Sequence, residues 1–348
     1  MLSTLNLRAL AWSVAAVIGL AASVVLGSRG LQNFDAALVP YLAGTLFAAF
    51  GIVYRYAVWM QRPPTRRFWR RSVELVFSRR ALGMARTAAW RGVRDIAGQA
   101  FIFRRNGTRG LAHVLLAWGC LTAFAITLPL TFGWVHFTLQ DGSTTIYQAH
   151  LFGFHVASFP LGSFLAFNVF HALNWSAVMV LAGVAYFVRK RMTDAALIST
   201  QTFEFDWMPL ILLAVVSLTG LGLTLDNEFL AGHAYPFMAT THAVSVILLL
   251  VWLPFGKFFH VFQRPAQMGV AVYQEAAAEG PQQVCPHTGE PFASQMQIRD
   301  LEDVTRELGM DYGLDGGGNH LHLSPVGKRA ALARAHLAAR AESGRLFG

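Results

Sequence analysis

The sequence predicts an all-α integral membrane protein, a bundle of about six transmembrane helices followed by a small cytoplasmic tail. Three observations predict this fold class. Of the 348 residues, 54% are hydrophobic and 14% are charged, whereas soluble domains carry about 25% charged residues. Six apolar segments are long enough to cross a bilayer. The basic residues gather in alternate loops, as expected of consecutive spans.

The predicted spans are apolar runs separated by polar or basic links. The first run follows Arg8 and has the position of a signal peptide, but it is long for one and its end, VVLGSRG, is a poor cleavage site. We therefore count it as a helix. The spans lie near residues 9–27, 37–60, 110–132, 163–188, 207–226 and 236–261.

The loops orient these spans. Residues 61–109 hold thirteen arginines against two acids, and the link Arg189-Lys190-Arg191 is also basic, whereas loops 133–162 and 227–235 contain no lysine or arginine. The positive-inside rule then places both termini in the cytoplasm, in the inner membrane of a bacterial cell. The net charge of +9 reports this topology rather than nucleic-acid binding.

The arginine-rich loop mixes apolar residues with arginines over residues 72–103. One interpretation is one or two amphipathic helices at the headgroups, with arginines on anionic membrane lipid. The other is a docking surface for a cytoplasmic partner, and the two are compatible.

Residues 265–348 form the tail. Leu301, Val304 and Leu308 have helical spacing and Gly309 is a stop signal, and a second helix is predicted over roughly 327–342. The tail is too short for an independent enzyme domain.

Two histidines bracket the last predicted span. His242 and His260 are eighteen residues apart, which in one continuous helix is five turns and roughly 27 Å, so both imidazoles would share a face near opposite membrane surfaces. Ionisable groups at membrane depth suggest function, and imidazole is a common axial ligand of haem iron. We therefore expect one ligand for each of two stacked haems.

His113 lies at the depth of His260 on the cytoplasmic side, so the two are predicted to hold one haem. Arg109 and Lys257 lie one turn away and would neutralise haem propionates. The alternative is a pair of ordinary interfacial histidines. On the outer side, His171 is the best partner for His242, followed by His136 and His155.

The outer side also carries several other polar side chains. They are ordinary loop residues or a quinol pocket, in which a histidine or an acid accepts the protons of quinol oxidation. The group comprises His136, His150, His155, His233, Tyr147, Asp141 and Tyr235.

The last span resembles that of a known family: His242, then eleven residues, Pro254-Phe255, Lys257 and His260. The segments VPYLAGTLFAAFGIVYRY and RGLAHVLLAWG resemble its earlier helices. The family is the gamma subunit of respiratory nitrate reductases and the related membrane cytochromes b of heterodisulfide-reductase-type complexes. The resemblance covers residues 37–264, with residues 1–36 as an added span and loop and residues 265–348 as the tail.

The resemblance implies that His113 and His260 bind the inner haem b and that His242 binds an outer one. The family's second outer ligand falls at Ala123, so the outer haem takes another ligand, such as His171, or is absent. It also implies electron transfer between the quinone pool and a cytoplasmic iron–sulfur, molybdopterin or flavin partner, in either direction. The alternatives are a membrane anchor without the full haem complement and a small-solute transporter.

The tail resembles a zinc-ribbon module in part. The segments CPHTGEPF and LSPVGKR have the form of two knuckles, but Thr288, Ser324 and Gly327 stand where cysteines are usual, beside Cys285. The chain's other cysteine is Cys120. We expect a degenerate module that packs on a partner rather than a closed metal site.

Overall fold

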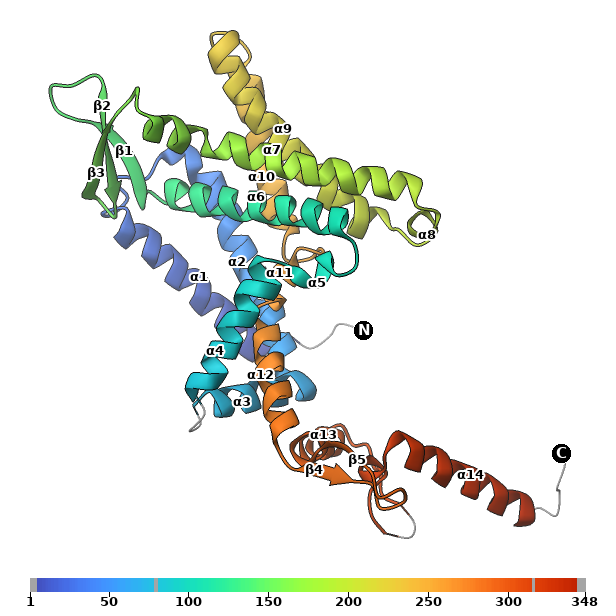
Figure 1. Cartoon of the computed structure of the whole chain (residues 1–348). Helices are drawn as coiled ribbons and strands as arrows, with labels where there is room; N and C mark the ends of the chain where they lie inside the picture. Colours follow the sequence, from blue (N-terminus) through green and yellow to red (C-terminus); the bar gives the residue numbers. More distant parts are fainter. Residues whose placement is uncertain (1–4, 78–80, 315–316, 343–348) are drawn as a thin grey trace. The chain divides into compact units, whose positions relative to one another are not determined.

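A computed structural model describes residues 5–77, 81–314 and 317–342 (Figure 1). The chain forms two compact units. The first, here the membrane unit, comprises Met1–Val58 and Arg94–Gln263, and the second, the tail unit, comprises Trp59–Val93 and Arg264–Gly348. The sequence groups the whole arginine-rich loop with the spans, whereas the structure folds Trp59–Val93 with the tail.

Helices dominate the membrane unit. The structure has six helices long and apolar enough to cross a membrane among its described residues, which confirms the predicted fold class. They are α1 (Leu7–Gly27), η1 with α2 (Ala36–Leu38, Val39–Gln61), α6 (Gly107–Thr131), α7 (Phe164–Thr193), η3 with α9 (Phe203–Trp207, Met208–Phe229) and α10 (Tyr235–Trp252).

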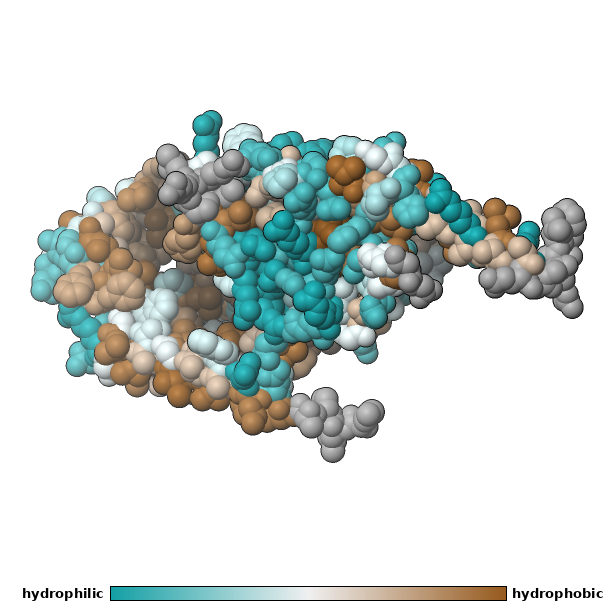
Figure 2. Space-filling model, turned by 90° about the horizontal axis from the view of Figure 1, so that it is seen from below, coloured by the Kyte–Doolittle hydropathy of each residue, from teal (hydrophilic) through white to brown (hydrophobic). Residues whose placement is uncertain are grey.

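Their apolar side chains are largely uncovered by protein. Only 11% to 28% of each helix's most apolar window is buried, and large side chains such as Leu26 (79% exposed) and Phe164 (84% exposed) face outward. Hydrophobic residues reach the surface over wide areas in Figure 2. A water-soluble monomer does not expose apolar surface on this scale, so the chain is an integral membrane protein whose helices contact lipid.

Helices α6 and α7 pack with little between their backbones. A Cβ on Gly119 would lie 2.8 Å from the Ser176 carbonyl oxygen, and one on Gly183 would lie 2.7 Å from the Ala112 carbonyl oxygen. Small residues allow such close approach, which drives association where no water has to be displaced. A core then joins α7, α9 and α10 through Val180, Val184, Leu210, Leu213 and Leu249.

The prediction that the last span runs unbroken from 236 to 261 is wrong. Helix α10 ends at Trp252, a turn follows, and His260 belongs to the separate α11 (Phe259–Gln263). Pro254 has no N–H for the helical ladder. Gly256 fits directly against the Trp252 indole, where any Cβ would clash.

Arg55 of α2 supports this break. Its Nη1 donates to the carbonyl oxygens of Pro254 (2.8 Å) and Phe255 (3.2 Å), and its guanidinium lies 4.2 Å from the Phe259 ring centre. The carbonyls released by the turn are therefore satisfied by a charge from another span, as buried backbone groups require.

The loop 133–162, predicted to lie on the outer side, has regular structure. It folds into an antiparallel sheet, in the order β1 (Val135–Leu139), β2 (Ile146–Leu151) and β3 (Phe154–Pro160). Gly142 and Gly153 adopt a φ of +76° in the two connections, a conformation that glycine adopts without strain. The sheet leads directly into α7, whose first turn is capped by Ser163.

Short helices complete the membrane unit: α5 (Ala100–Phe103) precedes α6, and α8 (Ala195–Ile198) follows α7. The π-helix η2 (Gly92–Ala97) links the two units along the chain.

The tail unit confirms the predicted helices. The arginine-rich segment forms α3 (Pro63–Val76) and α4 (Ala81–Arg91), and Arg79 and Arg80 lie outside the described residues. The tail forms α12 (Ala266–Glu279), strands β4 (Gln282–Val284) and β5 (Pro291–Ser294), α13 (Gln295–Glu307), η4 (His320–His322) and α14 (Pro325–Glu342).

A buried carboxylate, Asp300, joins α13 to α3 and α12. It accepts hydrogen bonds from Arg67 and Arg71, each at 2.8 Å, and from the Tyr273 hydroxyl at 3.0 Å. Arg66 of α3 pairs with Glu307, which lies on α13 like Asp300. Arg66, Arg67 and Arg71, which precede the predicted lipid- or partner-binding segment 72–103, are therefore neutralised inside the tail unit.

The two zinc-ribbon-like knuckles meet around Cys285. A Cβ on Gly327 would lie 2.6 Å from Cys285 Sγ, and the Thr288 and Ser324 hydroxyl oxygens are 3.4 Å apart. Burial of the thiol raises its pKa, but hydrogen bonds from Ser324 and Thr288 outweigh that effect and lower it to about 6. Hydroxyl groups thus surround the single sulfur where a metal-binding ribbon has thiolates.

Candidate functional site

His113, in the second turn of α6, is held by a residue from outside its helix. Its Nδ1 lies 2.6 Å from Gln99 Oε1. Gln99 is buried and adopts φ +49°, a left-handed conformation that is costly for a residue with a side chain. The Phe187 ring of α7 packs edge-on against the imidazole, with ring centres 6.2 Å apart.

His242, the eighth residue of α10, is held by α9. Its Nδ1 lies 2.9 Å from the Thr219 hydroxyl oxygen, which is itself 2.7 Å from the Val215 carbonyl oxygen. Because the hydroxyl donates to that carbonyl, it accepts from the imidazole. Gly220 leaves room for the ring, since a Cβ there would lie 3.3 Å from His242 Cε1.

His260 and His171 are held by local backbone. His260 Nδ1 lies 2.5 Å from the Lys257 carbonyl oxygen, and His171 Nδ1 lies 2.8 Å from the Phe167 carbonyl oxygen. The His171 ring also stacks on Phe167, with ring centres 4.3 Å apart. The turn that ends α10 removes the five-turn register that the sequence predicts between His242 and His260.

All four predicted ligands therefore share one tautomer. Each Nδ1 faces an oxygen that accepts, so Nδ1 carries the proton and Nε2 carries the lone pair. Histidine ligands of metals characteristically donate their second ring nitrogen in this way. His233 has the same local geometry, with Nδ1 2.5 Å from the Leu230 carbonyl oxygen. The acceptors from other segments, Gln99 and Thr219, distinguish His113 and His242.

The two residues of the predicted outer pair, His171 and His242, have different neighbours. No hydrogen bond or ring contact joins His171 and His242 within residues 5–77, 81–314 and 317–342. His242 faces α9. His171 instead lines a cavity of about 390 Å³ with Tyr147, Phe170 and Ser163, between the sheet and the first turns of α7.

The two predicted propionate partners differ. Lys257 already pairs with Asp206, whose carboxylate also accepts from Arg191 at 3.0 Å. Arg109 is exposed in the first turn of α6, where its backbone N–H is capped by Asn106. Arg109 thus keeps its charge available, whereas Lys257 contributes to an ion cluster.

Three histidines of the predicted outer group lie on one face of the sheet. His136 and His150 stack with ring centres 4.8 Å apart, and His155 meets His150 at 5.8 Å. Burial lowers the pKa of His136, and the neighbouring His150 and Arg29 lower it further. No group of three or more histidine, cysteine or acidic side chains in the described part of the chain has a metal-binding arrangement.

Sequence reasoning missed four residues of this unit. Gln99, Thr219 and Arg55 are polar side chains whose partners lie in other segments, which no local pattern reveals. Asp226, a buried acid in the last turn of α9, could have been recognised from the sequence, because charges within spans are rare. Its Oδ1 accepts from the Ala234 N–H at 2.9 Å, and its Oδ2 is buried with no partner among the described residues.

No family model, curated protein or solved structure matches the chain.

Proposed function

We propose that the chain is a membrane cytochrome b subunit that carries electrons between the quinone pool and a cytoplasmic redox partner through one or two b-type haems. The observation that carries the proposal is the tautomer of His113 and His242. Each Nδ1 is fixed by an acceptor from another segment, Gln99 or Thr219, and each Nε2 is the basic nitrogen that iron binds.

The residues present fit haem unequally. His113 and His242 have the donor set and the anchoring of axial ligands, with Arg109 available for a propionate. His260, half-buried in α11, is the proposed second ligand of the inner haem. When bound, haem supplies one-electron chemistry. The protein's own contribution is to fix the imidazole tautomers, position the rings and exclude water.

The outer side supports quinone chemistry. The cavity beside His171 is lined by the aromatic rings of Tyr147, Phe167 and Phe170, which suit a flat ring. The histidines of the sheet are the proposed acceptors of protons released outside, since imidazole changes charge near neutral pH. The arginine distribution supports a bacterial inner membrane with both termini in the cytoplasm, where an iron–sulfur, molybdopterin or flavin partner would dock.

A membrane anchor with a reduced haem complement is the second candidate. Two observations favour it: Ala123 stands at the family's second outer ligand position, and His171 makes its contacts away from His242. The transporter alternative has no specific support.

Haem counted per chain tests the proposal. His113→Ala and His242→Ala are each expected to lose one haem, whereas the matched His233→Ala variant, which has the same local tautomer in an outer turn, keeps all of them. If His113→Ala and His242→Ala both retain the wild-type haem content, the ligand assignment is wrong. If His171→Ala also keeps the full content, the outer haem does not use His171.

A further inference from the structure

Helix α3 packs one face against other elements of the tail unit. Its Phe68 ring lies 4.7 Å from the Tyr273 ring of α12, and its Ser72 hydroxyl donates to the Gly269 carbonyl oxygen at 3.0 Å. On the same side, Arg67 and Arg71 bind Asp300. This face fixes the rotation of α3 in its unit and so determines which residues point outward.

The outer face of α3 is an apolar stripe flanked by unpaired arginines. Trp69, Val73 and Phe77 follow one another at intervals of four residues, which places them on one side of the helix. They are 51%, 37% and 83% exposed. Arg62 and Arg70 border the stripe, are exposed, and have no ion-pair partner among the described residues.

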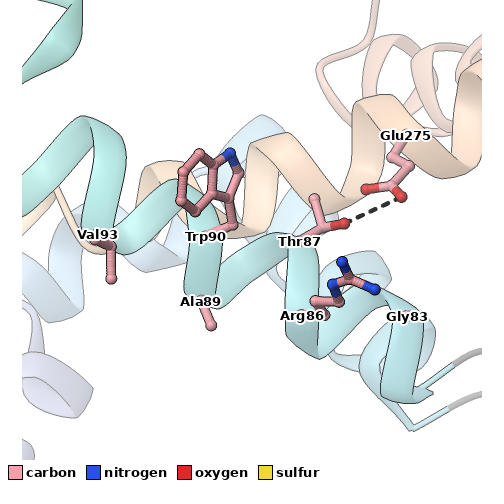
Figure 3. Close-up of a pocket in the computed structure, with 7 residues that line it drawn as sticks. All are labelled: Gly83, Arg86, Thr87, Ala89, Trp90, Val93 and Glu275. Atoms are coloured by element: carbon pink, nitrogen blue, oxygen red, sulfur yellow. Dashed lines mark hydrogen bonds between the residues drawn. The ribbon is translucent and has the colours of Figure 1, made fainter.

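Helix α4 repeats this chemistry beside an open cavity of about 790 Å³. Figure 3 shows Arg86, Thr87 and Trp90 along this stretch of α4, and the Thr87 hydroxyl donates to Glu275 of α12 at 3.1 Å. Trp90 is 61% exposed and Val93 is 63% exposed. Arg86 has no ion-pair partner among the residues that the structure describes.

The apolar stripe of α3 and the cavity beside α4 have the same chemistry, exposed aromatic side chains next to arginines. Exposed tryptophan and phenylalanine are costly in water but favourable at the membrane interface, where arginines also pair with lipid phosphates. Only Arg62 separates the last residue of α2 from the first residue of α3, so the chain holds the start of α3 at the end of a membrane span. A soluble partner would satisfy the charges but has no such tether.

We propose that the outer face of α3, together with Arg86 and Trp90 of α4, binds anionic phospholipid of the membrane that the spans cross. The phosphates pair with Arg62, Arg70 and Arg86, and the acyl region receives Trp69, Phe77 and Trp90. Six arginines of the loop thereby fall into two sets: Arg66, Arg67 and Arg71 are neutralised by α13, and Arg62, Arg70 and Arg86 by lipid. This proposal is independent of haem.

Hydrogen–deuterium exchange of the full chain tests the proposal in nanodiscs of phosphatidylcholine with and without phosphatidylglycerol. Backbone amides of α3 are expected to exchange more slowly with the anionic lipid, because each arginine at an anionic surface contributes about fivefold. Arg62→Gln/Arg70→Gln is expected to abolish the difference. The matched control is Arg299→Gln/Arg329→Gln, which removes two exposed arginines from α13 and α14 and is expected to keep it.

Three results would overturn the proposal. The wild-type exchange does not depend on phosphatidylglycerol, the control variant loses the difference as well, or α3 is protected only when a soluble protein fraction is added. The last result would assign the face to a protein partner.

Discussion

Different interactions stabilise the membrane unit and the tail unit internally. In the membrane unit, Gly119 and Gly183 let α6 and α7 meet backbone to backbone. In the tail unit, a buried carboxylate, Asp300, gathers two arginines and a tyrosine from α3 and α12. Between helices in lipid, close packing replaces the hydrophobic effect. In water, an ion pair whose hydrogen bonds are satisfied tolerates burial. The same chain therefore uses shape in one unit and charge in the other.

The largest effect is expected when the buried carboxylate of the tail unit is removed. Asp300→Ala leaves Arg67 and Arg71 without their shared partner and is expected to cost about 2–4 kcal/mol, below the cost for a fully buried pair because both arginines are partly solvated. Opening free energies from hydrogen exchange of α13 measure it. Asp303→Ala is the matched control, because Asp303 also pairs with Arg67 but its side chain is 43% exposed. If both variants lowered the opening free energy of α13 equally, the buried charge of Asp300 would not be what stabilises the tail unit.

The next effect concerns the haem site of the membrane unit. Gln99→Leu removes the acceptor from His113 Nδ1 and is expected to weaken haem retention about 10–100-fold, as loss of a ligand's hydrogen-bond partner does at other metal sites. Gln99→Glu keeps an acceptor and is expected to restore retention with a shifted haem potential. Haem loss to an apoprotein acceptor gives the rate, and redox titration gives the potential. Identical rates in all three proteins would show that Gln99 does not position His113.

A smaller effect is expected from a change in the close packing of α6 against α7 in the membrane unit. Gly183→Ala places a methyl group against the Ala112 carbonyl oxygen and is expected to cost about 1–3 kcal/mol by overpacking. Gly19→Ala, on an open face of α1, is the control and is expected to be neutral. Steric-trap or denaturant unfolding in detergent measures both. A neutral Gly183→Ala would mean that α6 and α7 do not depend on this contact.

The smallest effect is a pH dependence confined to the tail unit. Burial raises the pKa of Asp300, but hydrogen bonds from Arg71, Arg67 and Tyr273 outweigh it and lower the pKa below its ordinary value. Because the folded state prefers the carboxylate, its contribution is present above the unfolded pKa of about 3.9 and is lost as the pH falls through the lower folded pKa. The protection of α13 amides, measured relative to their intrinsic exchange rates at each pH, is therefore expected to fall below about pH 4. An Asp300→Asn protein that shows the same loss of protection would assign it to another group.

The sequence predicts what repeats over many residues. Six spans follow from long apolar runs, and α13 follows from Leu301, Val304 and Leu308 with Gly309 as its stop. Such patterns depend on local physics alone. The end of α10 does not depend on local physics alone, because the break at Pro254 is stabilised by Arg55, some 200 residues earlier in the chain.

The candidate site shows the same limit. The histidines stand out in the sequence because imidazoles are costly at membrane depth, but their acceptors do not. Gln99 is one ordinary amide in a polar link, and its strained backbone is visible only in three dimensions. The first strand of the sheet in loop 133–162 could have been predicted, since VHFTL alternates apolar and polar residues as a strand does.

The central claim is that the membrane unit holds histidine-ligated haem. The most direct test is the reduced-minus-oxidised optical spectrum of the wild-type full chain, purified after expression with ample haem and then treated with a quinol. The account predicts b-type bands that appear when the quinol is added. A purified, folded chain without any haem bands would contradict it.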